Sequence, residues 1–541
     1  MNSKSGYWDR VAPRTLGRRK VLGATAIGAA GLGAASLVGC GGGNSTGSTS
    51  PTTAAGAAST STVKHGSINH GTGGVATTLS PNSSALWSSE FYALYDPLVR
   101  LEADGSLSPA LATAWKQEAP DRWVFTLRDN VKWSDGQPFT ADDVKFTIDY
   151  ISDPANKSAQ LSRGGDVKSV EILDPKTVAF NMNGNNSVFM RRQALILIQP
   201  KHYLGNPSYG DAAQATKPVG TGPYTIDSYT QGSQINLKVN PNSWRQTQGV
   251  DAVHMRIIQE PTTLIAALQT GEVDLIDGVP INQVTQIGQF PHMKVVSAPS
   301  SAYNGFDLEY FDPPYNDKRV RLAMQYAVDS ASILKTIYFG TTKVMQGQML
   351  TSPTFGFNPN LQAYPYSPDK AKALLQQAGL PNGFQTKIEY RTDQYPSQQV
   401  AEAVASYFKA VGITATLVPI DISVWRDGLY GRRKRSPLMW NTWSSSLALE
   451  ASIALQWMLS SNAGKYYNRP DFDALYKQAF AETDDEKRKG IYAQATAIMN
   501  DDPPGMWIVE GPVLAAYDTS KIADLKLLGA PPIYYDTMRL A

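Results

Sequence analysis

The sequence is poor in the residues that build metal sites and disulfides. Among 541 residues it contains one cysteine, Cys40, which excludes an internal disulfide. It has no GxSxG elbow, no Walker loop and no HExxH pair. The five histidines are scattered along the chain: His65, His70, His202, His254 and His292. Because metal and general-base chemistry usually need imidazole or thiolate groups at workable spacing, we expect no metal, no cofactor and no catalytic residues.

An excess of one charge is also missing. The formal net charge is +2, and residues 1–39 hold six basic side chains against one acidic side chain, so removing them changes the net charge to −3. Such a body lacks the concentrated basic field that nucleic-acid recognition requires. Hydrophobic residues make up 42% of the chain, which is ordinary globular composition. The length predicts two or three structural units.

No apolar run is both long and strongly hydrophobic enough to favour a membrane span. Residues 21–38 are rich in Ala and Gly, follow a basic segment and end at Leu37-Val38-Gly39-Cys40. This segment resembles a bacterial lipoprotein signal with its lipobox. We therefore predict a cleaved signal peptide over residues 1–39 and lipidation of Cys40, with a retained membrane helix as the alternative. The pair Arg18-Arg19 only partly resembles a twin-arginine signal, so the export route stays open.

A flexible tether is predicted to follow the lipidated cysteine, and together they form residues 40–63. Residues 41–62 carry no charge and no aromatic side chain, so they cannot bury enough apolar surface to fold. Beyond the tether, short strand-like segments alternate with helical ones. Residues 123–127 and 177–180 are predicted strands, and residues 261–270 and 398–411 are predicted helices. The body is therefore predicted to have an α/β fold.

Two further helices are recognised by their ends. In the first, Ser367 suits the N-cap, Pro368 the first helical position and Gly379 the position after the last turn. In the second, Thr140 can cap a helix that begins at Ala141. We expect the nearby tryptophans to be packed scaffold residues: Trp115, Trp123 and Trp133.

One ordered set of segments identifies a family. It comprises YDPLV at 95–99, PALA at 109–112, WVFTLR at 123–128, VKWSDGQPFTADDV at 131–144, GTGPY at 220–224, LQTGEVD at 268–274, DKRVRLA at 317–323 and NRPDFD at 468–473. This set resembles the oligopeptide, dipeptide and nickel-type solute-binding proteins, often called family 5. The resemblance covers nearly all of residues 64–541.

The resemblance implies a two-lobed periplasmic-binding-protein clamshell, type II-like, with an extra subdomain in the first lobe. The first lobe would comprise residues 64–88, 215–298 and 508–541. Residues 89–214 would form the extra subdomain, and residues 299–507 the second lobe. A ligand would bind between the lobes and favour their closure.

The resemblance also directs attention to one position in the second lobe. In peptide-binding members, an aspartate three residues after a tryptophan pairs with the amino terminus of the peptide. Here the corresponding stretch runs from Trp443 to Ser446, and serine cannot neutralise an ammonium group. Burying that charge without a partner costs several kcal/mol, so ordinary peptides are disfavoured. Glu450 is the possible substitute on the next turn.

Other candidate ligand contacts come from both lobes. Arg391 falls near the position at which dipeptide-binding relatives hold a carboxylate, and a guanidinium can bind a carboxylate in a two-bond fork. The alternative is a surface arginine paired with Asp393. The remaining candidates are polar or aromatic: Asn82, Ser83, Ser84, Trp87, Trp443, Ser444 and Ser446. We expect Trp425 and Trp440 to belong to the core.

The sequence thus predicts a binding lipoprotein of an ABC importer rather than an enzyme. It would be a monomer anchored to the membrane in the periplasm or at the cell surface, and would deliver a small solute to permease subunits. The solute is predicted to be acidic and not a peptide. A peptide-binding member of the same family is the first alternative, and an exported hydrolase is the alternative of another class. An accessory ligand sensor without its own importer is a third possibility.

Overall fold

A computed structural model describes residues 63–74, 77–84, 88–164, 166–206, 210–431, 434–442, 448–529 and 533–541. Residues 62–541 form one compact unit, and all of the described residues belong to it. The predicted lipidation site at Cys40 lies outside the described residues, as do Trp87, Trp443, Ser444 and Ser446.

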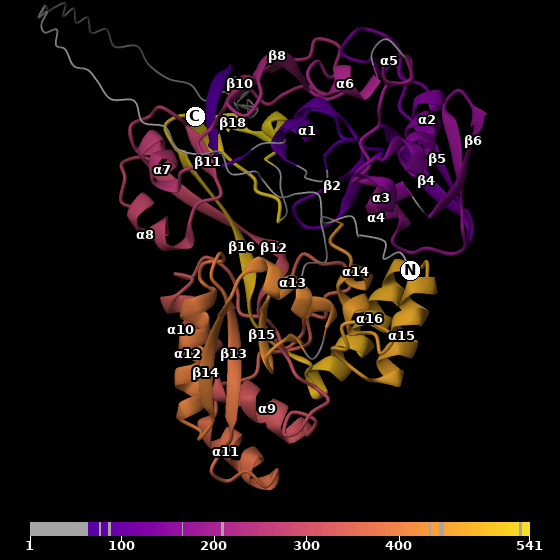
Figure 1. Ribbon diagram of the computed structural model, residues 1–541. Helices are drawn as coiled ribbons and strands as arrows, with labels where there is room; N and C mark the ends of the chain where they lie inside the picture. The colour runs from indigo at the N-terminus through magenta and orange to yellow at the C-terminus, as the bar shows by residue number, and fades with distance from the viewer. Residues whose placement is uncertain are drawn as a thin grey trace, which may run out of the picture. The chain divides into compact units, whose positions relative to one another are not determined.

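A ten-stranded mixed sheet runs through this unit (Figure 1). Its order is β14 (Thr414–Ile420), β13 (Gln385–Arg391), β15 (Leu438–Asn441), β12 (Met293–Leu308), β16 (Gly505–Asp518), β11 (Leu275–Asp277), β1 (Gly66–Thr72), β10 (Val250–Ile257), β9 (Gln234–Val239) and β8 (Tyr224–Thr230). The long antiparallel strands β12 and β16 are paired from Met293↔Asp518 to Asp307↔Gly505. These two central strands join the lobes, because one end of the pair bonds to β15 of the second lobe and the other end bonds to β11 of the first lobe.

The first lobe is built on β1, which pairs in parallel with β10 and β11. Helix α7 (Pro261–Gln269) confirms the helix predicted over residues 261–270, and the Glu260 side chain caps it by accepting from the Thr263 N–H. Strand residues Ile68, Val253 and Leu275 are fully buried in a core that also includes residues of β16 and of η6 (Tyr535–Thr537).

The subdomain is a four-stranded antiparallel sheet with helix α2 (Ala141–Ser152) packed on it. Its order is β4 (Ala112–Ala119), β5 (Arg122–Leu127), β7 (Thr177–Met182) and β6 (Val167–Asp174). Strands β5 and β7 confirm the two predicted strands. A capping box between Thr140 and Asp143 begins α2 as predicted. The tryptophan predictions also hold, because Trp133 is fully buried in this core and Trp115 and Trp123 pack against it.

The second lobe packs helices on the sheet formed by β13, β14 and β15. Helix α12 (Ser397–Lys409) confirms the helix predicted from its apolar stripe, and Val400, Val404 and Phe408 are fully buried. Helix α11 (Pro368–Gln377) also begins and ends as predicted, although the Ser367 side chain makes no capping hydrogen bond. A second core is formed mainly by α14 (Ala451–Leu455), α15 (Pro470–Ala481) and α16 (Asp485–Asp501).

The lobe boundaries predicted from the sequence fall inside these elements. Residue 299 lies in β12, next to a break in its register with β16, and residue 508 lies in β16. Residue 89 is the first residue of α1 (Ser89–Leu94), but buried residues up to Tyr95 still belong to the first-lobe core, and the subdomain core begins at Leu98. The domain limits stay a prediction.

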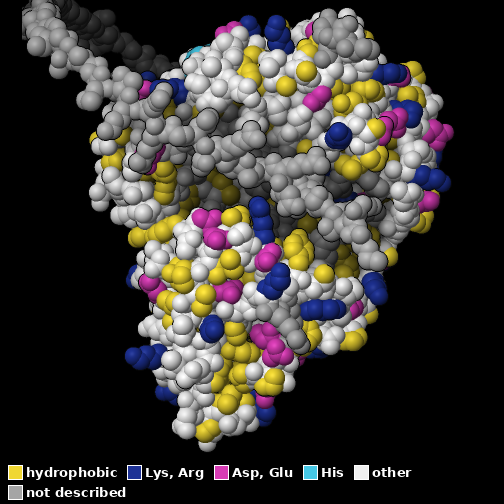
Figure 2. Space-filling model, viewed as in Figure 1, with side chains coloured by type: hydrophobic (Ala, Val, Ile, Leu, Met, Phe, Trp, Pro, Cys, Tyr) yellow, Lys and Arg dark blue, Asp and Glu magenta, His cyan; other side chains and the backbone are white. Residues whose placement is uncertain are grey.

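Charged side chains of both signs lie on the visible surface of the protein. On the face seen in Figure 2, acidic and basic side chains are interspersed rather than gathered into a patch of one sign. Among the residues described, no helix has the length and apolar character needed to cross a membrane.

Candidate functional site

The carboxyl ends of two neighbouring strands form the candidate site. Strands β13 and β15 pair in parallel, with Ile388 opposite Leu438 and Glu389 opposite Met439. By this register Arg391, the last residue of β13, lies level with Asn441, the last residue of β15. Ligands of open α/β sheets bind at the carboxyl ends of such strands. The fold thus brings Arg391 and the start of the segment that leads to Trp443 to one sheet edge.

Arg391 is buried and already holds a carboxylate. Its side chain is 3% exposed, and its Nε and Nη2 donate to Asp393 Oδ1 and Oδ2 at 2.7 and 2.6 Å. The guanidinium carbon also lies 4.8 Å from the centre of the Trp425 ring. Hydrogen bonds from Arg391 lower the pKa of Asp393. The pairing with Asp393 therefore exists, but the arginine is not the surface residue that the alternative described.

Tryptophan and asparagine side chains hold the sheet edge in place around Arg391. Trp440 is fully buried, as expected, and donates from Nε1 to Gln394 Oε1 at 2.9 Å. Trp425 is only partly buried and donates to the Trp440 carbonyl at 3.1 Å. Asn441 Nδ2 donates to Asp307 at 2.5 Å. These bonds fix the backbone at the ends of β13 and β15, so the site is largely preformed.

The predicted first-lobe contacts are occupied by other partners. Asn82 is buried and exchanges two amide hydrogen bonds with Gln199, each 2.9 Å long. The Ser83 hydroxyl donates to Asp211, and Ser84 is buried. The described contacts do not join this loop to Arg391. The side-chain amide of Asn82 is fully used in its bonds to Gln199, so Asn82 has a structural role.

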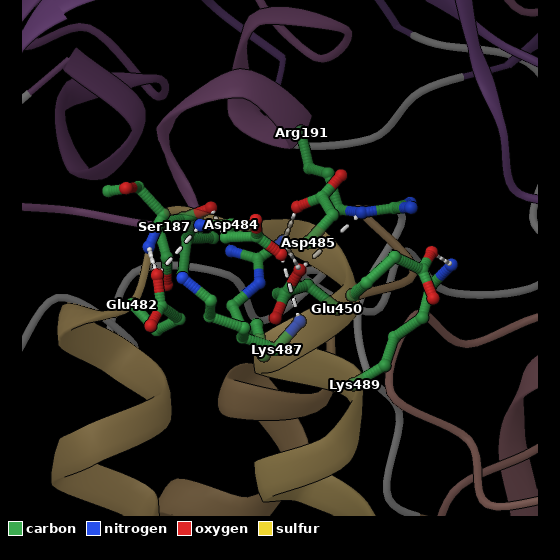
Figure 3. A network of polar contacts seen from close by, with 12 residues as sticks. Ser187, Arg191, Glu450, Glu482, Asp484, Asp485, Lys487 and Lys489 are labelled. Atoms are coloured by element: carbon green, nitrogen blue, oxygen red, sulfur yellow. Dashed lines mark hydrogen bonds and ion pairs between the residues drawn. The ribbon is translucent and has the colours of Figure 1, made fainter.

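Glu450, the possible substitute for the missing aspartate, lies in a buried group that we call the Glu450 cluster: Glu450, Arg191, Arg488 and Tyr492. Figure 3 labels Glu450 and Arg191 of this cluster. The Glu450 carboxylate lies 3.4 Å from Arg191 Nε and 3.6 Å from Arg488 Nη2, and it accepts from Tyr492 at 3.1 Å. Burial raises the pKa of Glu450, while the two arginines lower it. Because two guanidinium groups already compensate its charge, Glu450 is not free to bind the amine of a ligand.

Sequence reasoning missed Arg191 and Arg488. Arg191 lies on α4 (Phe189–Gln193) in the subdomain, Arg488 lies on α16 in the second lobe, and both stand over the Phe355 ring at 4.7 and 4.1 Å. No motif or short spacing marks them. The signal in the sequence is weak: Arg191 follows two apolar residues in a short helix, and Arg488 lies on a helix that also contributes buried residues.

Four histidine side chains of the described part of the chain have polar partners, and His70 has two, Tyr535 and Asp277. His65 contacts Asp251, His202 contacts Asp135 and His254 contacts Asn236, while buried His70 contacts Tyr535 at 2.6 Å. Within the described ranges there is no group of three or more His, Cys, Asp or Glu side chains that could hold a metal ion.

Comparison with known proteins agrees with this architecture. A family profile described as bacterial extracellular solute-binding proteins, family 5 middle, matches residues 106–466. The glutathione-binding protein GsiB of Escherichia coli (strain K12) is 26% identical over 442 residues, which cover 79% of this chain and 85% of that protein. GsiB of Shigella flexneri serotype 5b (strain 8401) is also 26% identical, with the same coverage.

Solved structures show the same fold at low sequence identity. HbpA2 from Haemophilus parasuis aligns with a TM-score of 0.78 at 22% identity and covers 88% of this chain and 100% of its own. NikZ from Campylobacter jejuni, solved with Ni(L-His), aligns with a TM-score of 0.67 at 21% identity, over 87% of this chain and 97% of its own. The profile match spans well over half of the sequence. The chain therefore belongs to the bacterial extracellular solute-binding proteins of family 5, which bind solutes for ABC importers.

Proposed function

We propose that this protein is the lipid-anchored member of its importer and that its solute carries an acidic group but no free amino terminus of a peptide. The fork between Arg391 and Asp393 carries this proposal. The guanidinium at the end of β13 already pairs with a planar carboxylate, that of Asp393, which supports a role in binding a carboxylate of the ligand. Asp393 is 49% exposed, so it can turn toward solvent and leave its place to a carboxylate of the ligand.

The two positions considered for an ammonium partner support the second half of the proposal. A peptide ammonium needs an anionic partner when it is buried. Ser446 stands where the family aspartate is expected, and Glu450 is matched by Arg191 and Arg488. A solute with a carboxylate and no ammonium avoids this cost.

Glutathione is the second candidate, because GsiB proteins are among the relatives of this chain. It has two carboxylates, one of which would suit Arg391, and one ammonium group, which would need a partner outside the groups named here. Binding of glutathione and of short peptides therefore decides between the proposal and the peptide-binding alternative. The relatives are solute-binding proteins, and we propose no enzymatic activity.

The test uses the chain from residue 41 onward. Thermal-shift screening of acidic solutes, their uncharged amides, glutathione and short peptides identifies ligands, because a ligand at 100 times its Kd adds about 2.7 kcal/mol of stability. Calorimetry on Arg391→Ala should then show at least about tenfold weaker binding, since charge-assisted hydrogen bonds contribute about 1.5–3 kcal/mol.

Arg319→Ala is the matched control. Arg319 forms a similar fork with Asp317 in the second lobe, but on the exposed first turn of α9 (Lys318–Ala327). The Arg319→Ala variant should bind the acidic solute with the same affinity as the unaltered chain. The proposal would be contradicted by unchanged affinity in Arg391→Ala. It would also be contradicted if peptides raised the melting temperature strongly and acidic solutes did not.

The anchor and the domain division belong to the same proposal. We infer a signal peptide over 1–39, lipid on Cys40, a tether to residue 63, a monomeric body and the lobe limits given above. In cells, Cys40→Ser should move the protein from the membrane fraction to the soluble fraction. Continued sedimentation with membranes in detergent-free buffer would indicate a retained membrane helix instead.

A further inference from the structure

Asp277 is an acidic residue of the first lobe in a position like that of Arg391 in the second lobe. It is the last residue of β11, and Arg391 is the last residue of β13. The Asp277 side chain is 38% exposed. Ligands of open α/β sheets bind at the carboxyl ends of strands, so both positions are suited to contact a solute.

Strands β11 and β13 each end toward the other lobe. Strand β16 begins in the second lobe and runs to the first, where β11 pairs with it antiparallel, so β11 ends toward the second lobe. Strand β12 runs opposite to β16, β15 is antiparallel to β12, and β13 is parallel to β15. Strand β13 therefore ends toward the first lobe, and Asp277 and Arg391 lie at the edges of the two lobes that face each other.

A buried histidine holds Asp277 in place. His70 is fully buried, and its Nε2 lies 3.5 Å from Asp277 Oδ2 while its Nδ1 contacts the Tyr535 hydroxyl at 2.6 Å. Burial raises the pKa of Tyr535, so its hydroxyl keeps its proton and can donate to Nδ1, which leaves the Nε2 proton for Asp277. Among the described residues, no lysine or arginine forms an ion pair with Asp277. Its negative charge is thus positioned but not compensated by a cationic side chain of the lobe.

Asp277 and Arg391 lie on the same side of the long strands β12 and β16. The contacts of Asp277 lead into the first-lobe core that contains α1, and Arg391 lies beside Trp425 of α13 (Ile422–Tyr430). Figure 1 shows α1 and α13 on one side of these two strands. The two side chains therefore border the same part of the space between the lobes.

The lobes already touch on the opposite side of these strands. There Ile281 packs against the first-lobe core that contains α8 (Val284–Ile287) and against the second-lobe core that contains α10 (Ser330–Thr336). Figure 1 shows α8 and α10 on this side. The side of Asp277 and Arg391 is therefore the one available to a solute.

We propose that Asp277 binds a cationic group of the same solute whose carboxylate binds Arg391. The solute class is then a non-peptide acid with a cation at the end remote from its carboxylate, as in a linear ω-amino acid. This inference rests on the proposed role of Arg391 and extends it. Opposite charges on the two lobes match opposite charges on the solute, and both contacts form together only when the lobes close on it. Such a cation has its partner in the first lobe and needs none at Ser446.

Calorimetric titration of the chain from residue 41 with two matched series of compounds tests this inference. One series is the linear ω-amino acids from 4-aminobutyrate to 8-aminooctanoate, and the other is the ω-hydroxy acids of the same lengths. At the best length, the amino acid should bind at least about fivefold more tightly than its hydroxy analogue, because the contact is charge-assisted but Asp277 is partly exposed. The favoured length reports the separation of Asp277 and Arg391.

Variants of Asp277 assign this preference to one carboxylate. Asp277→Asn should weaken the amino acid about fivefold and change the hydroxy acid less than about twofold, whereas Asp277→Glu keeps the charge and should keep a preference for amino acids. Asp251→Asn is the matched control, because Asp251 is another first-lobe acid beside a histidine, His65, at 2.9 Å and is 47% exposed. It lies at the beginning of β10 rather than at a carboxyl end, so this variant should bind as the unaltered chain does. Melting curves check that each variant is folded.

Arg391→Ala separates this inference from the proposed function and should weaken both series alike, by at least about tenfold. If both series depend on Arg391 but amino acids have no advantage at any length, or keep it in Asp277→Asn, the role of Asp277 is refuted and that of Arg391 stands. If the advantage depends on Asp277 and Arg391→Ala binds as before, the role of Arg391 is refuted instead. Absence of binding in both series would refute a solute of this class.

Discussion

Replacing Arg191 with methionine should destabilise the protein through the acid that it leaves behind. Arg191 contacts Glu450, which is fully buried, and donates to the Gly105 carbonyl at 2.8 Å. Removing one partner of a buried ion pair costs about 3–5 kcal/mol, because the remaining charge stays buried. Arg488 and Tyr492 still contact Glu450, so we expect the lower end of this range, about 3 kcal/mol.

Urea unfolding followed by circular dichroism measures this loss, and a double-mutant cycle shows its cause. In Arg191→Met with Glu450→Gln, the uncompensated acid is gone. The double variant should therefore be more stable than Arg191→Met alone by about 1 kcal/mol or more. Arg192→Met is the control on the same helix. Arg192 pairs with Asp166 nearer the surface, and such pairs contribute about 0–1 kcal/mol.

Two results would refute this reasoning. One is additive losses in the double variant, which would mean that Arg191 acts through its packing on Phe355 rather than through Glu450. The other is an equal loss in Arg192→Met, which would mean that any arginine on α4 matters to the same extent.

Two further predictions concern carboxyl groups. Asp393→Asn should tighten binding of the acidic solute up to about tenfold in calorimetry, because a competing carboxylate is lost while its volume stays; weaker binding would show that Asp393 itself holds the ligand. Burial raises the folded-state pKa of Glu510 above its ordinary 4.5, so its favourable contribution is complete below pH 4.5 and is lost as the pH rises through the folded value. As the pH is lowered toward 4.5, the melting temperature should therefore change more favourably in the unaltered chain than in Glu510→Gln; an identical change in both would contradict this role.

Local signals explain which parts of the fold could be predicted. The stripe of Val400, Val404 and Phe408 repeats at helical spacing, and the capping box joins Thr140 to Asp143, three positions later. Each feature therefore lies within one short segment of the sequence. The Arg391–Asp393 pair was also foreseeable as one of two readings, because its partners are two residues apart. Its burial was not, since that depends on how Trp425 packs over the ends of β13 and β15.

Long-range pairing explains what escaped prediction. Arg191 and Glu450 are 259 residues apart, and only the docking of the subdomain on the second lobe brings them together. Asn82 looked like a ligand contact because loop amides often are, but its partner Gln199 lies 117 residues away. The charge of a buried side chain can be read from the sequence, whereas the partner that compensates it is a property of the tertiary structure.

The fork at Arg391 sets a condition on any solute that binds there. Asp393 is tethered two residues from the guanidinium, so it competes as an intramolecular partner at high effective concentration. A solute with only a carboxylate would replace the two hydrogen bonds between Arg391 and Asp393 by two equivalent ones. It would therefore gain little binding free energy. The remaining affinity must come from other contacts of the solute, and in a two-lobed protein these are complete only when both lobes face it. Under the proposal, displacement of Asp393 and closure of the lobes are therefore coupled, and a bare carboxylate such as acetate should bind weakly and leave the lobes free.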